Sequence, residues 1–205
     1  MRTSWKCAAA GFVVALALAG TARAAELKVG FITSLSGPGA SIGIPYGKGI
    51  AAGAVFSSAI GQDKIKIIQL DDASDPSNSS RNASKLVEEE NVDILIGTSS
   101  TPATAAMAAV AVAKKVPMIA VSPMPNIAPG EGGPWVISIP QPPPLMAKAV
   151  VDRMKASGVK TVGYIGYSDS WGDLVYDGLT KAAEPAGIKV VTNERYARAD
   201  SSVTA

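Results

Sequence analysis

The chain has 205 residues, with 19 Lys or Arg, 17 Asp or Glu and no His. The absence of His excludes the commonest general base, the commonest metal ligand and the Ser–His and Cys–His nucleophile pairs. The formal net charge is only +2 and the sequence has no block of Lys or Arg, so we expect no nucleic acid and no anionic membrane surface as a partner.

Residues 1–24 are typical of a secretory signal peptide. Arg2 and Lys6 precede an apolar run at residues 8–19, and Ala22-Arg23-Ala24 has the small residues that signal peptidase accepts. The run has 12 residues, fewer than the about 20 that a membrane-spanning helix needs. We therefore expect cleavage after Ala24 and a soluble, not membrane-spanning, protein in the periplasm.

Residues 25–139 alternate between short apolar runs and segments of helical period, which predicts a first α/β lobe. The apolar runs are partly β-branched and are bounded by Gly, Pro, Ser or Asp, as strands are. Apolar residues at helical spacing lie between the first four runs. This alternation favours a parallel sheet with helices on both faces. The predicted strands are residues 27–33, 65–70, 92–96, 118–121 and 135–139.

The first predicted helix and the loop before it are rich in glycine. The loop at residues 36–43 follows a strand, but its glycines match neither fingerprint of a nucleotide-binding loop, so we expect no cofactor. Gly47, Gly49 and Gly53 lie in the helix, where each lowers the helix propensity by up to about 1 kcal/mol. We interpret these three glycines as positions that pack closely against the sheet.

A change of composition at residues 140–144 predicts a connector. The segment Pro140-Gln141-Pro142-Pro143-Pro144 is stiff and cannot join a central strand, so we interpret it as a hinge. Residues 145–205 then predict a helix, a strand, a helix and a strand, the start of a second α/β lobe. Two strands and two helices leave an edge and a face uncovered, so this second lobe is predicted to be incomplete.

The segment at residues 97–102 is the strongest candidate for a binding site. In an open α/β sheet ligands bind beyond the carboxyl ends of the strands, and here Thr98, Ser99, Ser100 and Thr101 follow the third predicted strand. A helix N-terminus with hydroxyls beside it can bind a carboxylate without Lys or Arg. The alternative is that these hydroxyls only cap the helix, as we expect for Thr101 before Pro102.

Four segments after predicted strands, and one in the second lobe, carry a resemblance to a known family. The first-lobe segments are Ser36-Gly37-Pro38, Asp71-Asp72-Ala73-Ser74-Asp75-Pro76, Ile96-Gly97-Thr98-Ser99-Ser100, and Pro117-Met118-Ile119 with Ser122-Pro123. Residues 162–172 continue the series into the second lobe. In this order they resemble the periplasmic leucine/isoleucine/valine-binding protein family, the solute-binding proteins of ABC importers.

The resemblance implies a clamp without catalysis, in which the first lobe binds the carboxylate of a ligand and the second lobe closes over the rest. By this resemblance the ligand-binding hydroxyl after the third strand is Ser100 or Thr101, with Ser99 beside it. The loop after the fourth strand, which begins at Ser122, supplies further contacts. The expected partners are a small-molecule carboxylate or amino acid and the permease subunits of an ABC transporter.

At four positions the sequence suggests an apolar pocket or departs from the family pattern. Met124 replaces a small residue, and Asn126 replaces a hydroxyl residue. Ile42 lies where the family often has an aromatic wall, and Trp171 lies where it has a tyrosine. A pocket with these side chains suits an aromatic or other apolar acid at least as well as leucine. Alternatively, Met124 belongs to the core.

The sequence thus predicts an exported solute-binding protein that is not an enzyme and binds a branched-chain amino acid or a related apolar or aromatic carboxylate. Two other functions remain open at this point. One is a ligand-sensing domain of the same fold without a transport role. The other is an enzyme on a similar α/β scaffold, which could use only carboxylates, Lys or Tyr for its chemistry.

Overall fold

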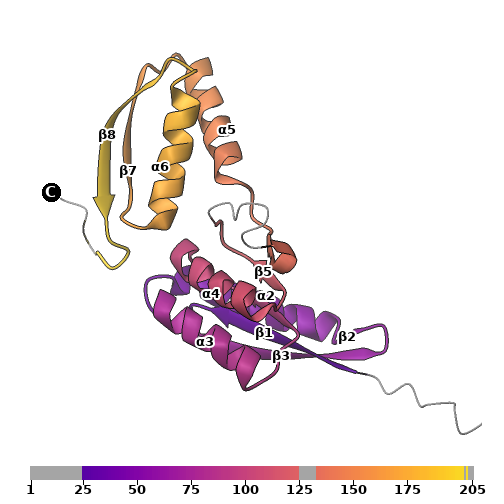
Figure 1. Cartoon of the computed structure of the whole chain (residues 1–205). Helices are drawn as coiled ribbons and strands as arrows, with labels where there is room; N and C mark the ends of the chain where they lie inside the picture. The colour runs from indigo at the N-terminus through magenta and orange to yellow at the C-terminus, as the bar shows by residue number, and fades with distance from the viewer. Residues whose placement is uncertain (1–24, 125–132, 201, 203–205) are drawn as a thin grey trace, which may run out of the picture.

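The computed structural model describes residues 25–124, 133–200 and 202, which form two α/β lobes joined by a short connector (Figure 1). The predicted signal peptide and Asn126 lie outside the described residues. Among the described residues, no helix is long and apolar enough to cross a membrane.

The first lobe is built on a six-stranded sheet with the strand order β2-β3-β1-β4-β5-β6. All neighbouring strands are parallel except the short edge strand β2, which pairs antiparallel with β3. The strands are β1 (Glu26–Thr33), β2 (Ala59–Ile60), β3 (Asp63–Asp71), β4 (Ile94–Gly97), β5 (Met118–Ala120) and β6 (Val136–Ser138), the last preceded by the 3-10 helix η1 (Gly133–Trp135). The predicted strands are confirmed, whereas β2 was not predicted.

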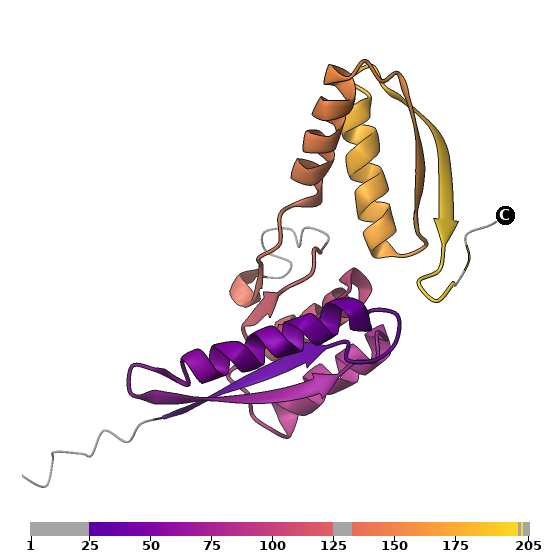
Figure 2. The same cartoon turned by 180° about the vertical axis from the view of Figure 1, so that it is seen from behind.

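Three helices cover the two faces of this sheet. Helix α2 (Ala40–Phe56) lies across one face, as Figure 2 shows. Helices α3 (Pro76–Glu88) and α4 (Thr101–Lys114) lie on the other face (Figure 1). The prediction of a parallel sheet with helices on both faces is therefore confirmed.

The core of the first lobe lies between the sheet and helices α3 and α4. Ile32 and Leu95 from the strands meet Leu86 and Met107 from the helices, and all four side chains are fully buried. Alternate strand residues point to opposite faces, so the neighbours of Ile32 and Leu95 face α2 instead. The side of the sheet that faces α3 and α4 therefore contains the main buried apolar cluster of the lobe.

The face under α2 is apolar but open. A groove of about 850 Å³ runs between the helix and the sheet, lined by strand residues such as Val29, Ile67 and Ile96. A Cβ placed on Gly49 or Gly53 would have no heavy atom within 4 Å. The prediction that these two glycines allow close packing against the sheet is therefore wrong, because α2 does not approach the sheet at this end.

The second lobe consists of two helices on one face of two parallel strands. A small core forms around Val151, Leu179, Ala183 and Ile188. The elements are α5 (Pro143–Ala156), β7 (Thr161–Tyr167), α6 (Ser170–Ala183) and β8 (Lys189–Tyr196), as predicted. Because α5 begins at Pro143, the connector is shorter than the predicted 140–144. Prolines fit the first turn of a helix, where their missing N–H has no intrahelical partner.

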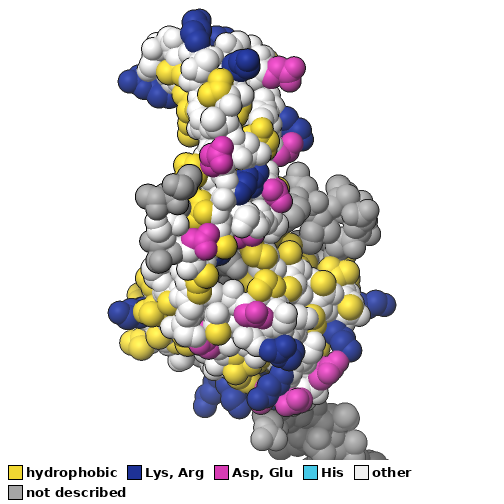
Figure 3. Space-filling model, turned by 90° about the vertical axis from the view of Figure 1, so that its left-hand side faces the viewer, with side chains coloured by type: hydrophobic (Ala, Val, Ile, Leu, Met, Phe, Trp, Pro, Cys, Tyr) yellow, Lys and Arg dark blue, Asp and Glu magenta, His cyan; other side chains and the backbone are white. Residues whose placement is uncertain are grey.

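The free face of the second sheet is exposed. Ile165 and Val191 on these strands are 58% and 52% exposed. Figure 3 shows the side of the molecule on which β7 and β8 lie, where Lys and Arg side chains are interspersed with Asp and Glu. This side therefore carries no large patch of a single charge.

Candidate functional site

A pocket of about 330 Å³ lies between the two lobes, at the carboxyl ends of the first-lobe strands. Strand β1 lies between β3 and β4, so the chain changes direction along the sheet between β1 and β4. Ligands of open α/β sheets bind at such a switch point. The volume falls at the lower end of the range for small-molecule sites, about 300–1,000 Å³. The larger groove under α2 is lined almost entirely by apolar residues and offers few donors for a carboxylate, so we place the candidate site in the interlobe pocket.

The structure brings six of the eight predicted site residues together in this pocket. Its lining residues come from α2, the loops after β4 and β5, the start of α4, the connector, α5, the end of β7, the start of α6 and the loop after β8. The predicted residues among them are Ile42, Ser99, Ser100, Thr101, Ser122 and Trp171. Met124 does not line the pocket but packs in the first-lobe core, where it is 8% exposed.

Sequence reasoning missed several lining residues, above all Tyr46, Tyr167 and Arg198. Tyr46 lies on α2, one turn after Ile42. Tyr167 ends β7, and Arg198 lies in the loop that follows β8. The rule that sites form after the carboxyl ends of strands, applied to the second lobe, would have pointed to the last two.

The N-terminus of α4 points into the pocket. Ser100 is the N-cap residue, with φ −138° and ψ 148°, and its side chain makes no capping hydrogen bond. The first turn of a helix leaves backbone N–H groups without intrahelical partners, and their partial positive charge attracts an anion. The predicted capping role of Thr101 is wrong, because Thr101 is already inside the helix and its hydroxyl donates to the carbonyl of Pro123 at 2.7 Å.

A buried carboxylate organises the loop that leads into α4. Asp72 is fully buried and accepts hydrogen bonds from the hydroxyls of Ser34, at 2.7 Å, and Thr98, at 2.5 Å. The hydroxyl of Ser99 in turn donates to that of Ser34 at 2.5 Å. The backbone N–H of Ser74 also donates to Asp72, at 2.9 Å. Asp72 therefore holds the loops after β1, β3 and β4 together and is a structural carboxylate.

Of the four serine and threonine hydroxyls that line the pocket, one has an uncommitted proton among the described residues. Ser99 donates to Ser34, Thr101 donates to Pro123, and Ser122 donates to the carbonyl of Thr98 at 2.6 Å. The hydroxyl of Ser100 is buried and has no hydrogen-bond partner. A buried polar group without a partner is costly, so Ser100 is the hydroxyl prepared to donate to a ligand.

An exposed carboxylate beside this network fixes the start of α2. Asp71 accepts from the hydroxyl of Ser36 at 2.7 Å and from the backbone N–H groups of Leu35 and Ala73, both at 2.8 Å. Desolvation acts to raise the pKa of Asp71, but the hydrogen bonds from Ser36, Ala73 and Leu35 outweigh it and lower the pKa below its ordinary value. The lowered pKa shows that these bonds favour the charged form.

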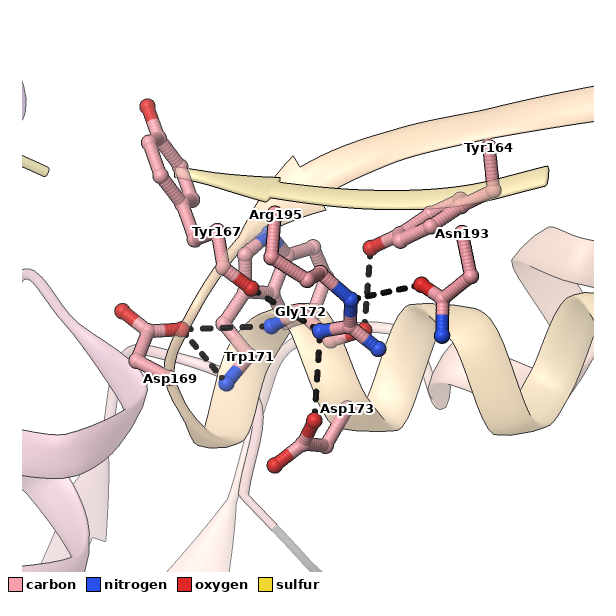
Figure 4. Close-up of polar contacts among 8 residues, drawn as sticks. All are labelled: Tyr164, Tyr167, Asp169, Trp171, Gly172, Asp173, Asn193 and Arg195. Carbon is pink, nitrogen blue, oxygen red and sulfur yellow. Dashed lines mark hydrogen bonds and ion pairs between the residues drawn. The ribbon is translucent and has the colours of Figure 1, made fainter. Parts of the chain in front are cut away.

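The second-lobe wall of the pocket is the turn from β7 into α6, drawn in Figure 4. Asp169 caps α6 and accepts from the backbone N–H of Trp171 at 2.9 Å and of Gly172 at 3.2 Å. A Cβ on Gly172 would lie 1.8 Å from the carbonyl oxygen of Tyr167, so only glycine allows this close turn. The turn thereby places the ring of Trp171 at the pocket.

Arg195 stabilises the same turn from outside the pocket (Figure 4). Its Nη1 donates to the carbonyl of Tyr167 at 2.9 Å and contacts Asp173 at 3.1 Å, and its Nε donates to Asn193 at 2.7 Å. Its guanidinium lies 5.1 Å from the ring centroid of Tyr164. Burial raises the pKa of Tyr164, although the charge of Arg195 opposes the rise. This cluster is structural, since Arg195 does not line the pocket.

The described residues contain no group of three or more acidic, His or Cys side chains that could hold a metal ion. The chemistry of the pocket is therefore that of hydroxyls, backbone amides, aromatic rings and one guanidinium. Two α/β lobes with such a pocket between them define a two-lobed ligand-binding protein.

The chain belongs to the periplasmic binding protein family, which matches residues 26–205. This family is extracytoplasmic, and its members bind small molecules. Among solved structures, an extracellular ligand-binding receptor from Rhodopseudomonas palustris HaA2 is similar, with 43% sequence identity and a TM-score of 0.80 over 87% of this chain and 48% of that one. No curated protein matches the chain.

Two further similar structures are solute-binding proteins of ABC transporters from R. palustris. One, in complex with benzoate, is 25% identical with a TM-score of 0.76 over 85% of this chain and 49% of that one. The other, in complex with 4-hydroxybenzoate, is 26% identical with a TM-score of 0.75 over 86% and 48%. The chain thus spans about half the length of these structures. All are binding proteins, which confirms the prediction that the chain is not an enzyme.

Proposed function

We propose that this protein is the extracytoplasmic solute-binding component of an ABC importer and binds an apolar or aromatic carboxylate between its lobes. The observation that carries the proposal is the buried, unpartnered hydroxyl of Ser100 at the N-terminus of α4. The carboxylate would accept from this hydroxyl and from first-turn N–H groups, while Ile42 and Trp171 contact the apolar body. The solved neighbours with benzoate and 4-hydroxybenzoate support this ligand class.

The lining favours a simple carboxylate over an α-amino acid. An ammonium group needs acceptors, most often a carboxylate, yet no Asp or Glu is among the described residues that line the pocket. The branched-chain amino acid that the sequence also allowed is therefore the weaker candidate. Export through a signal peptide cleaved after Ala24, a hinge at the connector and delivery to permease subunits complete the proposal.

The test is the replacement Ser100→Ala in the full chain, with benzoate as the titrated probe. Loss of one charge-assisted hydrogen bond should weaken binding by about 1.5–3 kcal/mol. The stability of the ligand-free protein should stay the same or rise slightly, because the variant removes a buried group that has no partner. Calorimetry and chemical denaturation measure the two effects.

Ser79→Ala is the matched control. The Ser79 hydroxyl is also buried without a partner, but it lies on α3, away from the pocket. This variant should bind benzoate as the wild type does. Unchanged affinity in Ser100→Ala, or an equal loss in both variants, would show that the carboxylate is not bound at α4.

A further inference from the structure

Arg198 contributes the only formal charge among the described residues that line the interlobe pocket. It lies two residues beyond the end of β8 and faces the pocket together with Tyr167 and Trp171. Its side chain is 21% exposed, so it is largely covered and not a freely solvated surface arginine.

Two contacts from the β7–α6 turn hold Arg198 in place. Its Nε donates to Asp169 at 2.5 Å, and its guanidinium carbon lies 4.1 Å from the ring centroid of Tyr167. Asp169 uses its other oxygen to bind the backbone N–H of Trp171. The same carboxylate therefore fixes both the guanidinium and the aromatic wall, and Arg198 reaches the pocket already oriented.

Most of the donors of Arg198 remain available. A guanidinium has five N–H groups, and Nε uses one of them on Asp169. The Nη groups have no hydrogen-bond acceptor among the described residues. Arg195 makes a useful comparison, because it also stacks on tyrosine rings, but it does not line the pocket, and its Nη1 is bound to the backbone carbonyl of Tyr167 and to Asp173. Of the two arginines, only Arg198 offers free donors to a pocket ligand.

We propose that Arg198 is a specificity-determining residue that binds a second oxygen acceptor on the ligand. The inference rests on the proposed function and narrows its substrate class. The preferred ligand would carry a carboxylate for the N-terminus of α4, an apolar body against Trp171, and a hydroxyl or second carboxylate that accepts from Arg198. A plain monocarboxylate would leave the guanidinium donors unpaired in the closed pocket.

The test compares benzoate with 4-hydroxybenzoate and benzene-1,4-dicarboxylate by titration calorimetry on the full chain. At least one of the two para-substituted acids should bind about tenfold or more tightly than benzoate, as expected for one hydrogen bond to a charged donor. In Arg198→Gln this ratio should fall to about one, because the variant removes the charged donor for the second oxygen acceptor. A general loss of structure would weaken the binding of all three acids alike and would leave this ratio of affinities unchanged.

Arg195→Gln is the matched control, since it removes an equally buried, ring-stacked arginine that does not line the pocket. It should keep the wild-type ratio. If benzoate binds and neither para-substituted acid binds more tightly, or if the ratio survives in Arg198→Gln, the role of Arg198 is refuted while the proposed function stands. If none of the three acids binds, both proposals fail.

Discussion

The two faces of the first-lobe sheet are both apolar but are packed very differently. Toward α3 and α4, residues such as Leu95 and Met107 are fully buried. Toward α2, the neighbouring strand residue Ile96 lines an open groove of about 850 Å³, and Phe56 at the end of the helix is 94% exposed. An apolar pattern in the sequence thus shows which face of a strand can be buried. How much that face stabilises the fold depends on how many side chains pack against it.

Helix α2 is attached to the sheet mainly at its N-terminus. A Cβ on Gly43 would lie only 2.0 Å from the carbonyl oxygen of Ser34, and the hydroxyl of Thr33 donates to the carbonyl of Gly43 at 3.1 Å. The backbone N–H of Gly39 donates to Ser74 at 2.8 Å. The end of α2 that bears on the interlobe pocket is therefore fixed by polar contacts and close backbone approach, while its other end stands away from the sheet.

The largest expected effect on stability is the difference between alanine substitutions at two adjacent residues of β4. Leu95→Ala removes a fully buried side chain from a packed core and should lower the free energy of unfolding by about 3 kcal/mol. Ile96→Ala removes a partly exposed side chain from the open groove and should lower it by about 1 kcal/mol, since no closed cavity is left. Chemical denaturation of both variants measures the difference, and equal losses would show that the two faces are packed alike.

The next effect compares two glycines within α2. Gly43→Ala places a methyl group against the backbone of Ser34 and should destabilise the protein by about 2 kcal/mol, because backbone cannot move away cheaply. Gly49→Ala meets no atom within 4 Å and should stabilise it by about 0.5–1 kcal/mol through higher helix propensity. Thermal unfolding decides the sign of each change. A destabilised Gly49→Ala would mean that α2 packs along its whole length.

Local sequence patterns were sufficient to predict most of the fold. The strands β1, β3, β4 and β5 are apolar runs bounded by turn residues, and Asp75 caps α3 by accepting from the N–H of Asn78, as its place before Pro76 predicts. The sequence could not show that Gly49 and Gly53 lack neighbours. A glycine in a helix is compatible both with close packing against a neighbour and with a position that has no neighbour. Only the three-dimensional structure distinguishes the two cases.

Site residues that directly follow a strand could be predicted from the sequence. Contacts between side chains that are far apart in the sequence could not. Ser99, Ser100 and Thr101 were predicted because they follow β4. The bond from Thr101 to Pro123 spans 22 residues, so its effect on the cap could not be read from the sequence. Arg198 was missed because the strand-end rule was not carried through to β8, and its contact with Asp169, 29 residues away, could not be read from the sequence.

The smallest expected effect concerns pH and the polar attachment of α2. The folded pKa of Asp71 lies below its ordinary value, so its hydrogen bonds to Leu35, Ser36 and Ala73 stabilise the fold above about pH 4, the ordinary range of an Asp. This stabilisation is lost as the pH falls through the folded pKa. Because Asp71 is largely exposed, solvent screening makes the loss smaller than either effect above.

Denaturation midpoints at pH 6 and pH 3.5 measure this contribution, since Asp71→Asn removes the titrating group and should make the acid-side decrease shallower than in the wild type. Asp152→Asn in α5 is the control, because the one ion pair of its carboxylate within the described part of the chain is with Lys148 on the same helix, in the other lobe. An acid-side profile that is the same for Asp71→Asn and the wild type would mean that the charge of Asp71 does not fasten the loop before α2. The close approach at Gly43 would then be the main attachment of this helix to the sheet.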